Sequence, residues 1–122
     1  MKKKVILIGW HPDAVEFDKW PGLTPEKLMG AIRADSEVLR DAGFHIDVCL
    51  LTSAKSAVAE AESALSAASY DVVVIGAGVR RDEDHTLTFE ALVNAVHKSA
   101  PQASFAFNTN PFDTADAVKR WA

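Results

Sequence analysis

A histidine and an aspartate, two positions apart, follow the first apolar segment of the chain. This segment covers residues 4–8, and Trp10-His11-Pro12-Asp13 comes soon after it. An imidazole can act as a general base near neutral pH, and a neighbouring carboxylate can orient the ring or act beside it. We therefore take His11 and Asp13 as candidate catalytic residues.

A second charged group follows a later apolar segment, with the sequence Arg80-Arg81-Asp82-Glu83-Asp84-His85. Adjacent guanidinium groups can bind a carboxylate or a phosphate, and the free amides at the start of a following helix add to the attraction. The three acids can instead pair with the arginines locally. Both interpretations stay open, with Arg80 and Arg81 as candidate anion ligands and His85 as a further candidate catalytic residue.

The two histidines can also be considered together as metal ligands. His85, His11 and a nearby aspartate would supply the three ligands that zinc and iron sites use. No closely spaced ligand motif accompanies them, and a surface histidine near the start of a helix is the commoner situation. We predict no metal site and no bound cofactor.

Two glycines, Gly76 and Gly78, follow the third apolar segment. The third glycine that a dinucleotide-binding motif requires is replaced by Arg81, and the segment follows the wrong strand for that motif. The glycines instead allow a tight turn, or let a ligand approach the main chain. We include both as candidate ligand-binding residues.

Asparagines and tryptophans in other loops complete the candidate site. Asn108 and Asn110 lie in a turn after the last apolar segment, where their amides can orient a ligand. Trp10 and Trp20 can line a pocket, or they can pack the long first loop against the protein. All four are candidate ligand-binding residues.

Hydrophobic patterns predict the strands that position these residues. Residues 4–8 and 71–75 are almost continuously apolar, which is typical of strands buried on both faces. Residues 44–51 alternate between apolar and polar side chains, which indicates an edge strand. A fourth strand is predicted at residues 103–107.

Helices are predicted between the strands. A capping threonine, a proline at the first position and a glycine beyond the end predict a helix over residues 25–42. Ser53 is placed to cap an alanine-rich helix that ends near Ser69. A third helix follows residue 85, and Asp113 is placed to cap a short last helix.

This alternation predicts one α/β domain over residues 1–122, with a parallel sheet between two layers of helices. The burial patterns favour the strand order 2-1-3-4, a flavodoxin-like or Rossmann-like three-layer sandwich. The alternative order, 3-2-1-4, would bury the charged second strand. In the preferred order the candidate residues meet at the carboxyl ends of the strands, where open α/β sheets bind ligands. We expect the loops of His11 and Arg80 to meet over one pocket.

The composition and charge of the chain narrow the classes of partner that we expect. The chain has 122 residues, 48% of them hydrophobic, and a formal net charge of -4. An acidic chain without an extended basic run is not expected to bind nucleic acid or an anionic membrane surface. Its single cysteine, Cys49, cannot form an internal disulfide, which favours a cytoplasmic location.

The first strand and the His-Pro-Asp motif are similar to the start of zinc deacetylases of the N-acetylglucosaminyl-phosphatidylinositol deacetylase type. Residues 5–13 and 43–52 carry the resemblance. In that family the histidine binds zinc and the first aspartate is the general base, and His11 and Asp13 match these positions. The second zinc-binding aspartate is replaced by Ala14, so we carry neither the zinc site nor the activity over.

Over nearly its full length, the chain resembles a family of short, uncharacterised bacterial proteins. The resemblance lies in residues 21–28, 75–80 and 108–111. It implies a Rossmann-like fold and no particular activity.

Two hypotheses of function follow. In the first, the protein is a binder or a small enzyme for a small anionic metabolite, and His11 and Asp13 support hydrolysis or isomerisation. In the second, it is a non-enzymatic protein that forms homo-oligomers through Phe105 and Phe107 on its edge strand.

Overall fold

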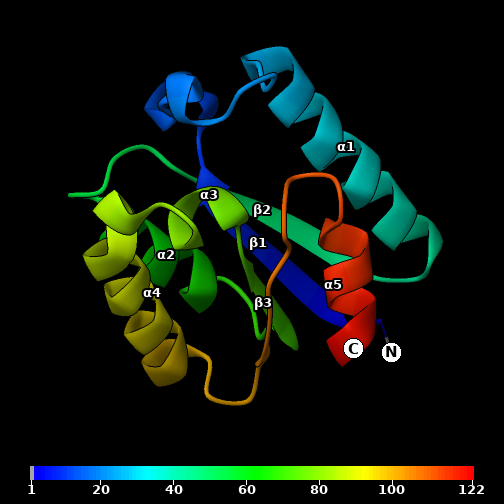
Figure 1. Ribbon diagram of the computed structural model, residues 1–122. Coiled ribbons are helices and arrows are strands. Elements are labelled where there is room, and N and C mark those ends of the chain that lie inside the picture. The colour runs from blue at the N-terminus through cyan, green and yellow to red at the C-terminus, as the bar shows by residue number, and fades with distance from the viewer. Residues whose placement is uncertain (1) are drawn as a thin grey trace.

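A computed structural model describes residues 2–122 as a four-stranded sheet with helices on both sides (Figure 1). The strands are β1 (Lys4–Trp10), β2 (His45–Leu51), β3 (Val72–Ile75) and β4 (Ser104–Ala106). Neighbouring strands are parallel, and their order is β2-β1-β3-β4. The predicted order is confirmed, and the alternative with the second strand in the centre is wrong.

Within residues 2–122, the segments between and after the strands contain five α-helices and three short 3-10 turns. The helices are α1 (Pro25–Asp41), α2 (Ala57–Ser66), α3 (Ala77–Arg80), α4 (Thr86–Ser99) and α5 (Thr114–Trp121). The 3-10 turns are η1 (Pro12–Ala14), η2 (Phe17–Lys19) and η3 (Glu83–His85). Within residues 2–122, no helix has the length and apolar character that crossing a membrane requires.

The sheet separates two layers of helices, as expected for an α/β sandwich. Helices α1 and α5 lie on one face, and α2 and α4 lie on the other (Figure 1). Alternate residues of β1 serve the two faces: Val5 and Leu7 pack toward α1 and α5, whereas Ile6 and Ile8 pack toward α2 and α4. A strand that must be apolar on both faces has to be apolar throughout, which explains the pattern of β1.

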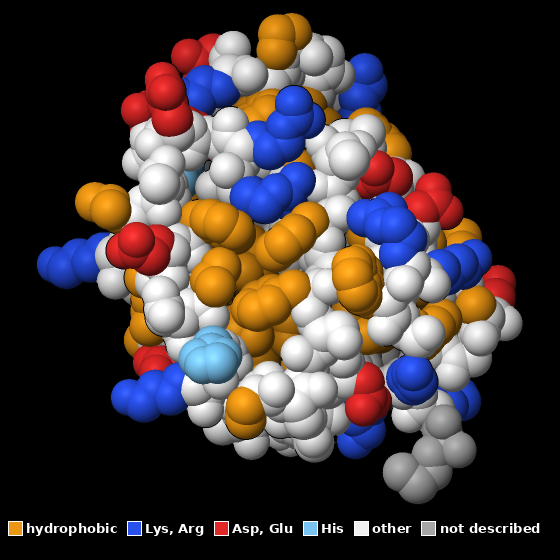
Figure 2. Space-filling view, turned by 60° about the horizontal axis from the view of Figure 1, so that its bottom comes forward, with side chains coloured by type: hydrophobic (Ala, Val, Ile, Leu, Met, Phe, Trp, Pro, Cys, Tyr) orange, Lys and Arg blue, Asp and Glu red, His pale blue; other side chains and the backbone are white. Residues whose placement is uncertain are grey.

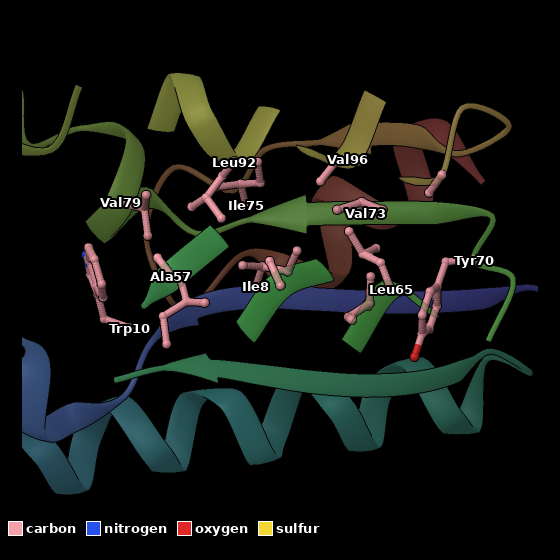
Figure 3. Packing of buried hydrophobic residues seen from close by; sticks show 14 residues of the cluster. Ile8, Trp10, Ala57, Leu65, Tyr70, Val73, Ile75, Val79, Leu92 and Val96 are labelled. Atoms are coloured by element: carbon pink, nitrogen blue, oxygen red, sulfur yellow. The ribbon is translucent and has the colours of Figure 1, made fainter. Parts of the chain in front are cut away.

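The larger apolar cluster fills the space between the sheet and the pair α2 and α4. Figure 3 shows Trp10 and Tyr70 at opposite ends of this cluster, with Ile8 and Val73 between them. Trp10 lies at the end where β1 leaves the sheet, and it is only 8% exposed. The core therefore extends up to the edge of the sheet at which the candidate residues gather.

The second strand, β2, lies at the edge of the sheet and carries both apolar and polar side chains that are partly exposed. Val48 is 37% exposed, although the alternation placed it inward. Asp47 is half-buried, and the Tyr70 hydroxyl donates to its carboxylate at 2.7 Å, which compensates for the partial loss of contact with water. Polar residues in β2 are thus accommodated by the open side of the sheet.

Two helix starts differ from the expectation. The second helix begins at Ala57 rather than near Ser53, because the Ser53 hydroxyl accepts from the amide of Ser56 and closes a turn ahead of it. The last helix begins at Thr114, but the Asp113 side chain does not cap it. The amide of Thr114 instead donates to Asp35 of α1 at 2.8 Å.

An aromatic cluster covers the β4 edge of the sheet. The rings of Phe105 and Phe107 are stacked with centroids 5.8 Å apart, and Phe89 of α4 meets Phe107 edge-on at 6.1 Å. All three side chains are half-buried. Figure 2 shows this face, where hydrophobic side chains gather in the middle and Lys or Arg side chains border them above.

Candidate functional site

The loops that follow β1, β3 and β4 meet at the carboxyl edge of the sheet. Helix α1 then runs along one face, while α3 and α4 lie toward the other (Figure 1). The amide of Gly76 donates to the carbonyl oxygen of Ile8 at 2.9 Å, which keeps the first and third strands together up to this point. Beyond this point the chain continues to opposite faces of the sheet after β1 and after β3. A crevice therefore opens between the two loops, as expected from the strand order.

A cavity of about 80 Å³ occupies this crevice on the α1 side of the sheet. Five of the predicted ligand-binding residues line it: Trp10, Trp20, Gly76, Gly78 and Asn108. Apolar side chains supply most of the remaining wall, among them Leu28, Ile32 and Leu50. No residue with an ionisable side chain lines the cavity within residues 2–122. The cavity can therefore enclose an apolar group.

Trp10 forms the inner wall of the cavity. Its Nε1–H donates to the carbonyl oxygen of Gly78 at 3.3 Å. The centroid of the His85 ring lies 4.9 Å from that of the indole, in a tilted contact. Trp10 thus separates the cavity from His85, one of the candidate catalytic residues.

Asn108 is buried and uses both ends of its amide within the protein. Its Oδ1 accepts from the amide of Ala77 at 2.8 Å, and its Nδ2 donates to the Thr114 hydroxyl at 2.9 Å. The side chain therefore joins the first residue of α3 to the first residue of α5. It shapes the cavity wall and occupies the amide that an anion at the start of α3 would need.

His11 and Asp13 lie beside one another but do not line the cavity. The Nδ1 atom of His11 accepts from the amide of Asp13 at 3.1 Å and so caps the 3-10 turn η1. The Asp13 carboxylate is 94% exposed and lies 3.7 Å from the same nitrogen. In this arrangement the imidazole shapes the loop.

The third candidate catalytic residue, His85, has a different carboxylate neighbour. Its Nε2 atom lies 3.8 Å from Asp82. Among the described residues, no three His, Cys, Asp or Glu side chains are grouped so as to hold a metal ion.

Arg80 is bound to the main chain. Its guanidinium donates to the carbonyl oxygens of Ile75, at 3.2 Å, and of Asn108. The same group lies 5.1 Å from the centroid of the Phe107 ring. Burial and the neighbouring Arg81 lower the pKa of Arg80 from its ordinary value. These contacts tie the end of β3 to the loop after β4.

Arg81 and Asn110 also make local contacts. Arg81 donates to the carbonyl oxygen of Thr109 at 2.8 Å. The Asn110 side chain accepts from the amide of Phe112 at 2.7 Å, as in a turn, and is exposed. Neither residue, and not Arg80, lines the cavity.

Lys19 is a residue of this edge that the sequence did not single out. Its ammonium group lies 2.9 Å from Asp82, 2.8 Å from Asp84 and 3.2 Å from Glu16. Hydrogen bonds to Asp84 and Asp82 raise the pKa of Lys19, and Lys19 lowers the pKa of Asp82. Two of the acids after the arginines, Asp82 and Asp84, therefore pair with the first loop. In the sequence, three acids follow only two arginines, and this imbalance is the one sign that some of the acids pair with a cation elsewhere.

A wider groove of about 780 Å³ adjoins the cavity on its outer side. Trp20, Leu23 and Pro111 belong to both, so they form the boundary between them. The outer wall includes small residues of α1 and Lys27, whose Nζ donates to the carbonyl oxygen of Gly22 at 3.0 Å. Lys27 is the one ionisable residue among the described residues that line this groove.

The chain was compared with family models and with curated proteins, and it matches none of them.

Proposed function

We propose that this protein binds a small molecule in the crevice between the β1–α1 loop and α3. The observation that carries the proposal is the cavity itself, which lies at the switch point of the sheet and is lined by Trp10, Gly76 and Gly78. This is the position at which open α/β sheets take up ligands. A mostly apolar wall with a few polar groups is also typical of ligand pockets.

Binding is better supported than catalysis. An acid–base reaction needs an ionisable group within hydrogen-bond reach of the bound molecule. Within the described part of the chain, the cavity wall holds none, and His11 and Asp13 lie outside it. Arg80 and Arg81 already bind main-chain carbonyl groups, so they do not serve this proposal as anion ligands.

The proposal can be tested by screening small molecules and mapping where they bind. A panel of carboxylates, phosphates, alcohols and amides would be screened by thermal shift, and each stabilising compound titrated by ¹H–¹⁵N NMR. We expect the shifted amides to include Gly9, Gly76 and Gly78. The proposal fails if no compound class stabilises the protein, or if the shifts lie away from the crevice.

A second candidate function is self-association through the β4 edge. Phe105 of the edge strand β4 stacks on Phe107, the residue just after the strand, and both are only half-buried. Edge strands pair readily with another chain. Light scattering should then give a mass above the 13.2 kDa of one chain at micromolar concentration. Phe105→Asp should return the protein to a monomer. A monomeric wild-type protein would remove this candidate.

A further inference from the structure

The residue that keeps the cavity open is Gly9. Val5 and Leu7 of β1 point toward the α1 side of the sheet, and Gly9 is the next residue of the same row. It lines the cavity, and a Cβ atom built on it would meet no heavy atom within 4 Å. Its φ is not in the positive range, so the main chain does not require a glycine there.

Gly9 therefore weakens the strand, and no neighbouring atom of the fold would prevent a side chain at this position. Glycine in the interior of a strand weakens it, and it often marks a place where a ligand approaches the main chain. A larger residue would fill the volume beside Leu50, its partner in β2. The missing side chain thus points to an apolar group of the ligand in this position.

The volume limits that group. A cavity of about 80 Å³ is roughly half the size of the 150 Å³ apolar cavity that admits benzene. It suits a short or branched alkyl group better than an aromatic ring. The rest of the ligand must then extend past Trp20, Leu23 and Pro111 into the outer groove.

The outer groove contributes one charged side chain to the proposed binding site. Lys27 lines it, and the hydrogen bond to Gly22 uses one of the three N–H donors of the ammonium group. The groove also lies beside the first turn of α1, where the helix dipole favours an anion. Glu26 precedes Lys27 but does not line the groove.

The α1 wall of the groove contains a second glycine that no neighbouring atom of the fold requires. Gly30 lies inside the helix, and a Cβ atom built on it would meet nothing within 4 Å. Glycine is unfavourable in a helix interior. With Ala31 and Ala34 it keeps this side of the groove low, next to Lys27.

We infer that the ligand is a small amphiphilic anion, with a short alkyl group beside Gly9 and a carboxylate-like group at Lys27. This inference rests on the proposed function and specifies its ligand class. The neutral part of the ligand contributes through burial of apolar surface, and the ion pair at the groove contributes less because it is exposed to water.

The probes that test this are straight and branched monocarboxylates of four to eight carbons, each with its matching primary alcohol. Affinity would be measured by NMR titration of the full-length protein. We expect a carboxylate to bind about fivefold more tightly than its alcohol, which is the upper range for an exposed charge pair. Lys27→Met should remove this preference, whereas the matched control Lys55→Met should keep it.

Variants at Gly9 test the apolar half. Gly9→Ala and Gly9→Val should fold, with unfolding midpoints at or above that of the wild-type protein, because both remove an unfavourable glycine from the strand. Gly9→Ala should weaken the branched carboxylates more than the straight ones, and Gly9→Val should abolish binding. Carboxylate affinity that is unchanged in Gly9→Val would overturn the inference.

The remaining outcomes separate the two proposals. If alcohols and carboxylates bind equally and Lys27→Met has no effect, the amphiphilic anion is wrong and binding in the crevice stands. If no carboxylate binds, the inference is overturned, and the wider panel decides the proposed function. If Gly9→Val fails to fold, weaker binding of the branched carboxylates by the smaller Gly9→Ala variant still supports the inference, and unchanged binding by that variant overturns it.

Discussion

The indole of Trp10 donates to the carbonyl oxygen of Gly78 across the crevice, at 3.3 Å. This bond connects the last residue of β1 with α3, which follows β3. A Cβ atom on Gly78 would lie 3.5 Å from the Cδ1 atom of Trp10, an ordinary contact distance. The crevice is thus closed at its inner end by one hydrogen bond, and the position of Gly78 leaves room for a Cβ atom beside it.

Trp10→Phe should keep most of the packing of Trp10 and remove the donor. We expect the free energy of unfolding to fall by about 1 kcal/mol, the usual net contribution of one hydrogen bond. Trp10→Ala should lower it by about 3–5 kcal/mol, because it also leaves a cavity in the larger core. Urea unfolding followed by circular dichroism measures both, and a phenylalanine variant as stable as the wild type would contradict this role of the bond.

Arg80→Ala should act on stability. The side chain binds two carbonyl oxygens and lies against Phe107, so its loss should lower the free energy of unfolding by about 1.5–3 kcal/mol. Lys119→Ala, an exposed change on α5, should stay within about 0.5 kcal/mol of the wild type. Chemical denaturation compares the two variants, and equal stability would show that the Arg80 contacts contribute nothing.

Lys19→Met should loosen the first loop without unfolding the domain. The change removes the cation that joins Glu16 to Asp82 and Asp84. Amide hydrogen exchange should become faster in residues 12–23 and 82–85, and high salt should move the wild-type protein in the same direction because it screens exposed charges. Lys55→Met is the control. Unchanged exchange in the Lys19 variant would mean that the loop is held by its apolar contacts alone.

Asp47 should give the protein an acid-sensitive contribution to stability. The Tyr70 hydroxyl, and then His45, lower the pKa of this carboxyl from its ordinary value. The pKa is therefore lower in the folded than in the unfolded chain. The contribution is fully present above the unfolded value of about 4 and is lost as the pH falls through the folded value.

The measurement is the free energy of unfolding as a function of pH. Asp47→Asn should be less stable than the wild type at neutral pH, and the difference should shrink below about pH 4. Asp18→Asn, an exposed change in η2, is the control and should leave the profile unchanged. A constant difference between wild type and Asp47→Asn at all pH values would contradict the assignment.

Burial patterns were enough to predict the sheet. Continuously apolar strands are predicted to be central, so the sequence predicts β1 beside β3 and β2 at the edge, and this order is confirmed. Helix α1 was predicted to within one residue because its cap is local: the Thr24 hydroxyl accepts from the amide of Lys27. Such short-range signals can be recognised in a single sequence.

The roles of the site residues depend on contacts that a single sequence does not show. Arg80 binds a carbonyl 28 positions away, and Lys19 binds acids 63 and 65 positions away. Asp35 caps a helix that begins 79 positions later. The sequence places the candidate side chains in loops at the carboxyl edge of the sheet, but which of them face the cavity depends on the packing of the loops.

The sheet divides the apolar core into two clusters that share no residue. The larger cluster lies between the sheet and the helices α2 and α4. The smaller cluster lies on the α1 side of the sheet, as the cavity does. Substitutions far apart and without shared partners have additive effects on stability. Leu39→Ala and Leu92→Ala, on opposite faces, should therefore add. Under the proposed function, the residues of α1 that line the cavity can change during evolution while the opposite cluster retains the stability that tolerates such changes.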